Sequence, residues 1–174
     1  AIAGFSMGGY VAFEVLRQAP GRVTRLALLD TSSRLDTPEK AIGRRQTIAD
    51  CESGRFDAVI DGFVPLLLHP DRMAEPLADR VRAMGHRVGA ATFARRHRAM
   101  LTRAAPRDVL TAFDGPVRVI MGRSDRLTSL EEHRELADWA PRGRLSIVED
   151  CGHMPPLERP QAATALLRDW MLYD

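Results

Sequence analysis

The sequence predicts an α/β fold in which parallel strands alternate with helices. Short and almost uninterrupted apolar runs, of the kind found in strands buried on both faces, occur at residues 25–29, 117–121 and 145–148. Helical spacing of apolar residues, bounded by start and stop residues, occurs at residues 7–16, 129–139 and 160–172. Because strands and helices alternate along the chain, we expect the strands to be parallel and joined by right-handed crossovers.

A tight turn with a serine at its centre links an apolar strand end, Ala1-Ile2-Ala3, to the first helix. The turn is Gly4-Phe5-Ser6-Met7-Gly8-Gly9, which matches the G-x-S-x-G pattern of a nucleophile elbow. Such a turn closes only if the residues two before and two after the serine are small, as Gly4 and Gly8 are. The backbone N–H of Met7 would stabilise an anion beside the Ser6 hydroxyl. From this pattern alone, a glycine-rich turn with a passenger serine is the alternative.

A serine hydroxyl needs a base, and the base needs a carboxylate that orients it. Two later segments offer these groups in the order serine, acid, histidine. Gly122-Arg123-Ser124-Asp125 follows the strand at 117–121, and Cys151-Gly152-His153 follows the strand at 145–148. Both lie after the carboxyl end of a strand, the sheet edge where open α/β folds bind their ligands. Asp30, at the end of the strand at 25–29, is the rival acid, with a turn-capping role as its other interpretation.

The chain resembles the C-terminal two-thirds of an α/β-hydrolase-fold enzyme. The similarity is carried by Gly4–Gly9, Leu26-Ala27-Leu28-Leu29-Asp30-Thr31, Gly122–Asp125 and the segment from Cys151 to Pro160. It implies that Ser6 is the nucleophile, Asp125 the acid and His153 the general base, with the Met7 N–H in the oxyanion hole. Phe5 and Met7 flank the serine, where they would line the substrate pocket or simply pack.

Within that superfamily the chain is similar to small bacterial hydrolases that include enol-lactonases, carrier-protein methyl esterases and cofactor-free haloperoxidases. The resemblance implies hydrolysis of a small-molecule carboxylic ester or lactone through an acyl-enzyme, with no cofactor and no metal. Carbon–carbon bond hydrolases and haloperoxidases use the same residues, and some members of the fold bind a ligand without turning it over, so these remain alternatives. In this family the strand before the elbow is the fifth of eight. We therefore expect the N-terminal strands, and the loop that gives a second oxyanion N–H, to be missing from this sequence.

The middle of the chain is predicted to be a helical cap. Residues 1–35 and 107–174 would form the α/β core, and residues 36–106 the cap over the active site, with Pro38 near the start of its first helix. Residues 34–107 hold 14 Arg and Lys against 9 Asp and Glu, an excess of +5, whereas the rest of the chain holds 11 against 14. This basic region is either a solvated helical surface or a lid whose field attracts anionic substrates.

The remaining histidines show no metal-ligand spacing. His69, His86 and His97 lie in the predicted cap and are interpreted as surface or packing residues. His133, in the helix at 129–139, is interpreted as solvated. Cys151 lies next to the proposed base but is interpreted as filling the loop, because Ser6 already occupies the elbow.

Composition is typical of a globular protein that acts on small molecules. Of the 174 residues 45% are hydrophobic, enough for a core, and no apolar run approaches the roughly 20 residues of a membrane helix. Nucleic-acid binding is not expected, because the arginines are spread along helices and the few aromatic residues are placed for packing. The two cysteines, which suggest no disulfide framework, favour a reducing cytoplasm.

Overall fold

Four parallel strands form the centre of the computed structural model, which describes residues 1–74 and 76–174. Within these residues they are hydrogen-bonded in chain order: β1 (Ile2–Phe5), β2 (Leu26–Leu29), β3 (Val117–Gly122) and β4 (Gly143–Val148). The register pairs Phe5 with Leu29, and Leu29 with Ile120. The carboxyl ends of neighbouring strands therefore meet at one edge of the sheet. The predicted α/β fold with a parallel sheet is confirmed.

Helices connect the strands and cover the sheet. The connections of the core are α1 (Met7–Gln18), η1 (Pro20–Arg22), α6 (Arg107–Thr111), α7 (Leu130–Trp139), α8 (Pro155–Glu158) and α9 (Pro160–Tyr173). Between β2 and β3 lie α2 (Pro38–Glu52), α3 (Phe56–Leu67), η2 (Pro70–Arg72), α4 (Pro76–Val88) and α5 (Ala90–Leu101). All four predicted strands thus fall within two residues of their observed ends, and β4 begins two residues earlier than predicted because Gly143 already pairs with Val117.

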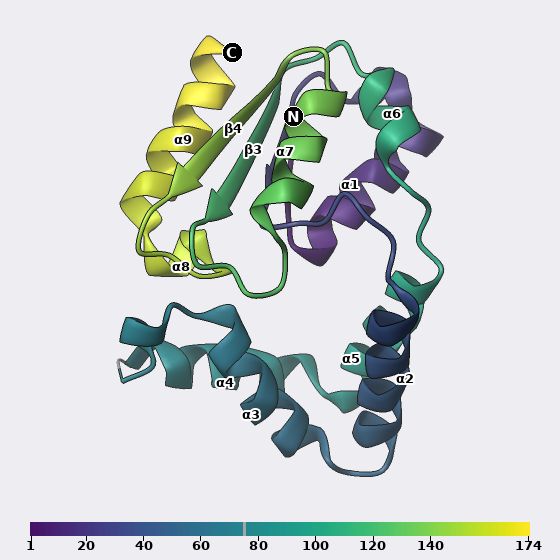
Figure 1. Cartoon of the computed structure of the whole chain (residues 1–174), viewed down its shortest axis with the longest axis vertical. Coiled ribbons are helices and arrows are strands. Elements are labelled where there is room, and N and C mark those ends of the chain that lie inside the picture. The colour runs from purple at the N-terminus through teal and green to yellow at the C-terminus, as the bar shows by residue number, and fades with distance from the viewer. Residues whose placement is uncertain (75) are drawn as a thin grey trace.

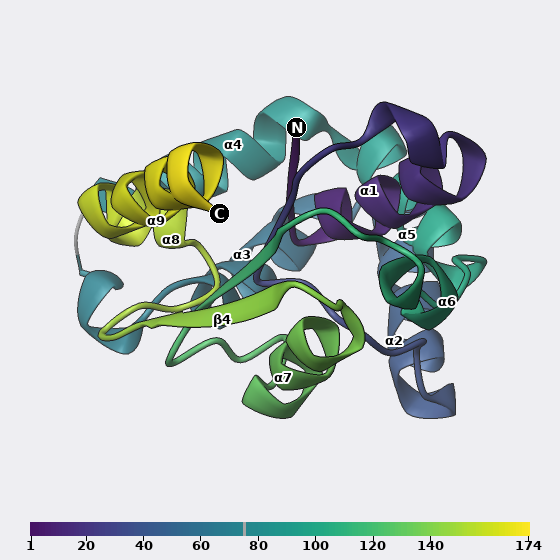
Figure 2. The same cartoon turned by 90° about the horizontal axis from the view of Figure 1, so that it is seen from above.

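The continuous apolar run of β2 follows from burial on both faces of the sheet. Leu26 and Leu28 pack in one hydrophobic cluster with residues of α1, α6 and α7, whereas Ala27 and Leu29 pack in another with Trp170 of α9. Side chains alternate between the two faces of a strand, so both sets must be apolar when helices cover both faces. Figure 2 shows α7 on one side of β4 and α9 on the other.

An ion pair inside the protein helps to fix α9 on the sheet. Arg118, in the middle of β3, is 4% exposed and donates hydrogen bonds to Asp174 at 2.6 Å and to Asp169 at 2.7 Å. A buried guanidinium without partners would be costly, so these carboxylates compensate it where α9 crosses the strand. Trp170 adds its apolar surface to the same contact.

Helices α2 to α5 gather beyond the carboxyl ends of β3 and β4, as Figure 1 shows. They hold a hydrophobic cluster of their own, which includes Ile60, Val64 and Val81 and reaches Met154 in the loop after β4. This arrangement supports, but does not test, the division into a core of residues 1–35 and 107–174 and a cap of residues 36–106, which stays a prediction. Within residues 1–74 and 76–174, no helix combines the length and apolar character needed to cross a bilayer.

Candidate active site

Ser6 occupies a sharp turn between β1 and α1. Its backbone has φ 50° and ψ −117°, a conformation that side chains rarely adopt, and surrounding hydrogen bonds hold it there. The Ser6 N–H donates to the Leu29 carbonyl at 2.8 Å, and the Ser6 carbonyl accepts from the Gly9 N–H at 2.9 Å and the Thr31 hydroxyl at 2.8 Å. The elbow is therefore fixed to the end of the neighbouring strand β2.

The turn requires glycine at two positions, one of which the sequence did not indicate. A Cβ on Gly4 would lie 2.5 Å from the Gly8 carbonyl oxygen, and a Cβ on Gly9 would lie 2.4 Å from the Thr31 hydroxyl. Gly8 itself has open space, so the predicted need for a small residue after the serine falls on Gly9 instead. The reason is that α1 passes against Thr31 through Gly9, while Gly8 faces away.

The structure brings together the three side chains that the sequence singles out. Nε2 of His153 lies 2.9 Å from the Ser6 hydroxyl, and Nδ1 of His153 lies 2.9 Å from a carboxylate oxygen of Asp125. The side chains of His153 and Asp125 are 1% and 0% exposed. Each comes from a loop at the carboxyl end of a strand, β3 for Asp125 and β4 for His153.

Asp125 is held as a carboxylate. Its oxygens accept hydrogen bonds from the Leu127 N–H at 2.8 Å, from the Thr128 N–H at 3.3 Å and from the Thr128 hydroxyl. Burial by itself would raise the pKa of Asp125, but the hydrogen bonds with His153, Thr128 and Leu127 outweigh it and leave the pKa below its usual value. An ionised Asp125 only accepts, so Nδ1 of His153 carries a proton and Nε2 is free to accept one from Ser6.

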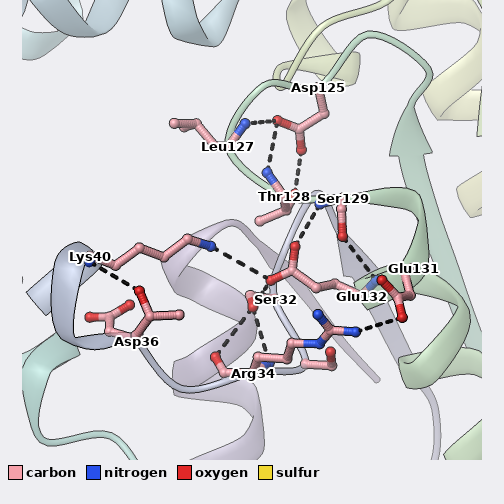
Figure 3. A network of polar contacts seen from close by, with 12 residues as sticks. Ser32, Arg34, Asp36, Lys40, Asp125, Leu127, Thr128, Ser129, Glu131 and Glu132 are labelled. Carbon is pink, nitrogen blue, oxygen red and sulfur yellow. Dashed lines mark hydrogen bonds and ion pairs between the residues drawn. The ribbon is translucent and has the colours of Figure 1, made fainter.

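Polar contacts link the loop that carries Asp125 to α7 and α2, as Figure 3 shows. Ser129 caps α7 in a reciprocal pair with Glu132: the Ser129 N–H donates to the Glu132 carboxylate at 2.6 Å. The same buried carboxylate accepts from the Ser32 hydroxyl, and Nζ of Lys40 in α2 lies 4.0 Å from it. The loop that carries Asp125 is thus linked to the start of α7 and to the segment leading into α2.

The loop that carries His153 is held from both sides by residues that the sequence did not single out. The His153 N–H donates to the Leu67 carbonyl, at the end of α3, at 2.9 Å. Glu158 is 3% exposed, and its carboxylate accepts from the Met154 N–H at 3.1 Å and the His69 N–H at 2.7 Å. Its place in the short helix Pro155–Glu158, five residues after the histidine, was the available signal.

Asp30, the rival acid, lies behind Asp125 and does not hydrogen-bond to His153 among the described contacts. It is fully buried, with φ 43°, and one of its oxygens accepts the Gly122 N–H at 2.8 Å. Its other oxygen has no hydrogen-bond partner within the described part of the chain. Burial raises the pKa of Asp30 well above 3.8; the Gly122 N–H opposes this and the nearby charge of Asp125 adds to it. We interpret Asp30 as a neutral acid that fixes the end of β3.

Asp30, Asp125 and His153 are also the one group of potential metal ligands that lie close together within the described residues, with ligand atoms within 4.8 Å of one another. Atoms of all three residues already form hydrogen bonds. Nδ1 of His153 bonds to Asp125, an oxygen of Asp125 also accepts from the Thr128 hydroxyl, and an oxygen of Asp30 accepts from the Gly122 N–H. These contacts favour a hydrogen-bonded role for the three side chains over metal binding, which would require Asp30 to lose its proton.

A cavity of about 650 Å³ opens beside Ser6. Phe5, Ser6, Met7 and His153 line it at the sheet edge, and the opposite wall comes from the helices between β2 and β3. That wall is mainly apolar, with Ile60, Phe63, Val64, Leu67, Val81, Met84, Val88, Phe93 and Met100. A volume of this size suits a small organic ligand. Phe5 therefore lies where a pocket residue would, and its ring centroid is 5.3 Å from that of His153.

His133 differs from its sequence interpretation, whereas His97 agrees with its own as a packing residue. His133 is fully buried, not solvated, because α7 buries the face formed by Glu132, His133, Leu136 and Ala137. His97 is 5% exposed, and its ring packs at 4.8 Å from the ring of Phe93 where it lines the cavity. The spacing of the α7 residues, in two adjacent pairs four residues apart, was the signal for His133.

A model of the alpha/beta hydrolase family matches residues 1–166, which is most of the chain. The chain belongs to the alpha/beta hydrolase family. A pimeloyl-acyl-carrier-protein methyl ester esterase of Aromatoleum aromaticum is 30% identical, over 97% of this chain and 72% of that protein. A 2-hydroxymuconate semialdehyde hydrolase of a Pseudomonas species is 28% identical, over 98% of this chain and 61% of that protein.

Solved structures of alpha/beta hydrolases share this fold. A thermophilic esterase from Thermogutta terrifontis, solved with malate bound, superposes with a TM-score of 0.91 at 29% identity. The match covers 97% of this chain and 63% of the esterase, so the chain spans somewhat less than two-thirds of that structure. These relatives are named as esterases and hydrolases.

Proposed function

We propose that this alpha/beta hydrolase cleaves a small-molecule carboxylic ester or lactone, with Ser6 as nucleophile, His153 as general base and Asp125 as the acid that orients it. The observation that carries the proposal is the chain of two 2.9 Å contacts, from the Ser6 hydroxyl to Nε2 of His153 and from Nδ1 to Asp125. Nucleophile, base and orienting acid within hydrogen-bond reach are what acyl transfer through serine requires.

The proposed reaction proceeds in two halves. Ser6 attacks the ester carbonyl carbon while Nε2 of His153 takes its proton, and the oxyanion of the tetrahedral intermediate is stabilised by the Met7 N–H at the start of α1. The carbon–oxygen bond to the alcohol then breaks, and His153 returns the proton to that alcohol. Water, deprotonated by His153, then attacks the acyl carbon; the bond to Ser6 Oγ breaks, His153 returns the proton to Ser6, and the acid is released. Asp125 stays ionised throughout and stabilises the imidazolium.

The cavity supports a substrate whose acyl part is mainly apolar. Its lining from α3 and α4 is apolar, and Ser6 and His153 line the same cavity. The names of the relatives, which include a methyl ester esterase, support the ester class for this chain. The helices that form this wall belong to the proposed cap, residues 36–106, so we assign substrate choice to that segment.

Hydrolysis of p-nitrophenyl esters tests the proposal. We expect turnover by the chain to fall by about 10⁴-fold or more in Ser6→Ala and in His153→Ala, because the two groups act as a unit. His86→Ala is the matched control, since His86 is an exposed cap residue whose loss should change turnover less than about twofold. Turnover that survives either active-site substitution would refute the assignment, and a chain that binds esters without turnover would be a ligand-binding member of the fold.

A further inference from the structure

One part of the cavity wall is basic. Four cationic side chains line it, against a single carboxylate, Asp36. The cations are Lys40, Arg44, Arg96 and Arg103, which come from α2, from α5 and from the residues directly after α5. The rest of the wall formed by the cap helices is mainly apolar, so this corner is distinct in chemistry from the acyl pocket beside it.

The charge in this corner is not balanced. Arg44 and Arg103 share the carboxylate of Asp36, through hydrogen bonds of 3.1 and 2.9 Å to the same oxygen. The side chains of Arg44, Arg103 and Asp36 are 20%, 9% and 6% exposed, so water solvates their charges poorly. Burial would raise the pKa of Asp36, but the bonds from Arg103 and Arg44 outweigh it and lower the pKa to about 2. Two guanidiniums with one carboxylate leave one positive charge without a counterion.

Arg44 has the donor that a ligand could use. Its Nε and Nη2 are taken by Asp36, but Nη1 faces the thioether sulfur of Met100 at 3.4 Å, a weak acceptor. Arg103 differs, because it also donates to the carbonyls of Met100 and Arg34 and lies 4.6 Å over the ring of Tyr10. Of the two guanidiniums that share Asp36, Arg44 is therefore the one with an N–H that faces only a weak acceptor.

The neighbouring groups favour an anion and not a cation. His97 lines the same cavity, and burial, together with the charge of Arg44, lowers its pKa to about 4, so it is neutral at neutral pH. Lys40, 4.0 Å from Glu132, adds a cation on the side toward the sheet. By contrast, Arg55, Arg82 and Arg98 form ion pairs outside the cavity, as Arg82 does with Asp61 at 2.8 Å.

We propose that Arg44, fixed by Asp36, binds a second anionic group of the substrate, so that the preferred substrates are esters or lactones whose acyl part ends in a carboxylate. The inference rests on the proposed function for the ester end of the molecule. The carboxylate replaces Met100 as the acceptor of the Arg44 Nη1 hydrogen bond and supplies the missing negative charge. The apolar wall between this corner and Ser6 accommodates the methylene chain that joins the two ends.

Paired substrates test the assignment. Hydrolysis is measured for monomethyl esters of linear dicarboxylic acids, from succinate to suberate, and for methyl esters of monocarboxylic acids of the same length. We expect wild type to prefer one length of the anionic series, and Arg44→Gln to lower kcat/KM for that ester by about tenfold or more. The same variant should change turnover of the neutral esters less than about threefold, and Arg44→Lys should restore part of the loss because it keeps the charge.

Arg82→Gln is the matched control, because it removes a cap arginine that does not line the cavity. An equal loss on both ester series in Arg44→Gln would overturn the inference and assign Arg44 a purely structural role. Neutral esters hydrolysed as well as anionic ones by wild type would overturn it while leaving the proposed function intact.

Binding to Ser6→Ala, measured by calorimetry, separates the inference from catalysis. This variant should bind the preferred monoester more tightly than its neutral counterpart, and the difference should disappear when Arg44→Gln is added. If no ester is turned over but this difference is found, the proposed function fails and the anion site stands. If the difference is absent, the anion site is refuted whatever the activity.

Discussion

Replacing Asp30 by asparagine should stabilise the protein at neutral pH, although it removes a fully buried polar residue. The folded chain raises the pKa of Asp30 well above 3.8, first through burial and then through the charge of Asp125. Above about pH 4 the unfolded chain therefore releases this proton while the folded chain keeps it, so Asp30 makes unfolding progressively easier as pH rises. Asparagine is neutral in both states and has no such dependence.

The magnitude follows from the geometry of the site. In wild type the Gly122 N–H lies 2.8 Å from Oδ1 of Asp30. The side-chain oxygen of Asp30→Asn can accept the same hydrogen bond, and asparagine tolerates the φ of 43° at this position. Near pH 4 we expect the free energies of unfolding of Asp30→Asn and wild type to differ little. Above pH 4 the variant should become more stable than wild type by about 1.4 kcal/mol for each pH unit, until Asp30 of the folded wild type ionises. Asp30→Ala, which leaves the Gly122 N–H unpaired, should instead lose about 1–3 kcal/mol near pH 4.

Urea unfolding of wild type, Asp30→Asn and Asp30→Ala at a series of pH values between about 4 and 8 measures these differences. The informative quantity is the difference between variant and wild type, because the other titrating groups contribute similarly to both. An Asp30→Asn variant that becomes less stable relative to wild type as pH rises would mean that Asp30 is ionised in the folded chain, and the interpretation of a neutral acid behind Asp125 would be wrong.

Three further outcomes can be checked. Gly122→Ala should lower both the melting temperature and turnover, because its Cβ would lie 1.8 Å from the Gly152 carbonyl oxygen, next to His153. Gly62→Ala, whose Cβ would have nothing within 4 Å, is the control, and equal losses in the two variants would contradict the role of this contact. The Cys151 thiol is fully buried, and burial raises its pKa above 9.0, so it should react with a disulfide reagent only after unfolding. Rapid labelling of Cys151 in the folded protein would contradict its burial. Ser129→Ala should lower the free energy of unfolding by about 1 kcal/mol, measured with urea, because α7 loses its capping box; an unchanged value would contradict this role.

The strands and their helices could be predicted because each signal is local. The run Leu26-Ala27-Leu28-Leu29 indicates burial on both faces, and Ser129 followed by Glu132 indicates the start of a helix. The burial of His133 was not predicted: the spacing of Glu132, His133, Leu136 and Ala137 marks one face of α7, but it does not show which face of the helix meets the sheet. The exposed neighbour Glu131 suggested a solvated face, and tertiary packing decided otherwise.

The three principal site residues could be singled out because each follows a strand end in a recognisable turn. The contacts that hold them could not be predicted, because they join residues far apart in the sequence: Glu158 accepts the His69 N–H, and Asp30 accepts the Gly122 N–H. The basic excess of residues 34–107 was visible in the sequence, but the sharing of the Asp36 carboxylate by Arg44 and Arg103 was not. Counts of charged residues in a sequence do not show which residues form ion pairs.

The most direct test of the account is the position of a covalent adduct. The chain is treated with a fluorophosphonate, digested, and mapped by mass spectrometry, in wild type and in Ser6→Ala. We predict a single phosphonylated residue, Ser6, since its hydroxyl lies 2.9 Å from Nε2 of His153, and no labelling of Ser6→Ala. An adduct on another residue, or labelling that persists in Ser6→Ala, would contradict the assignment of Ser6 as the nucleophile.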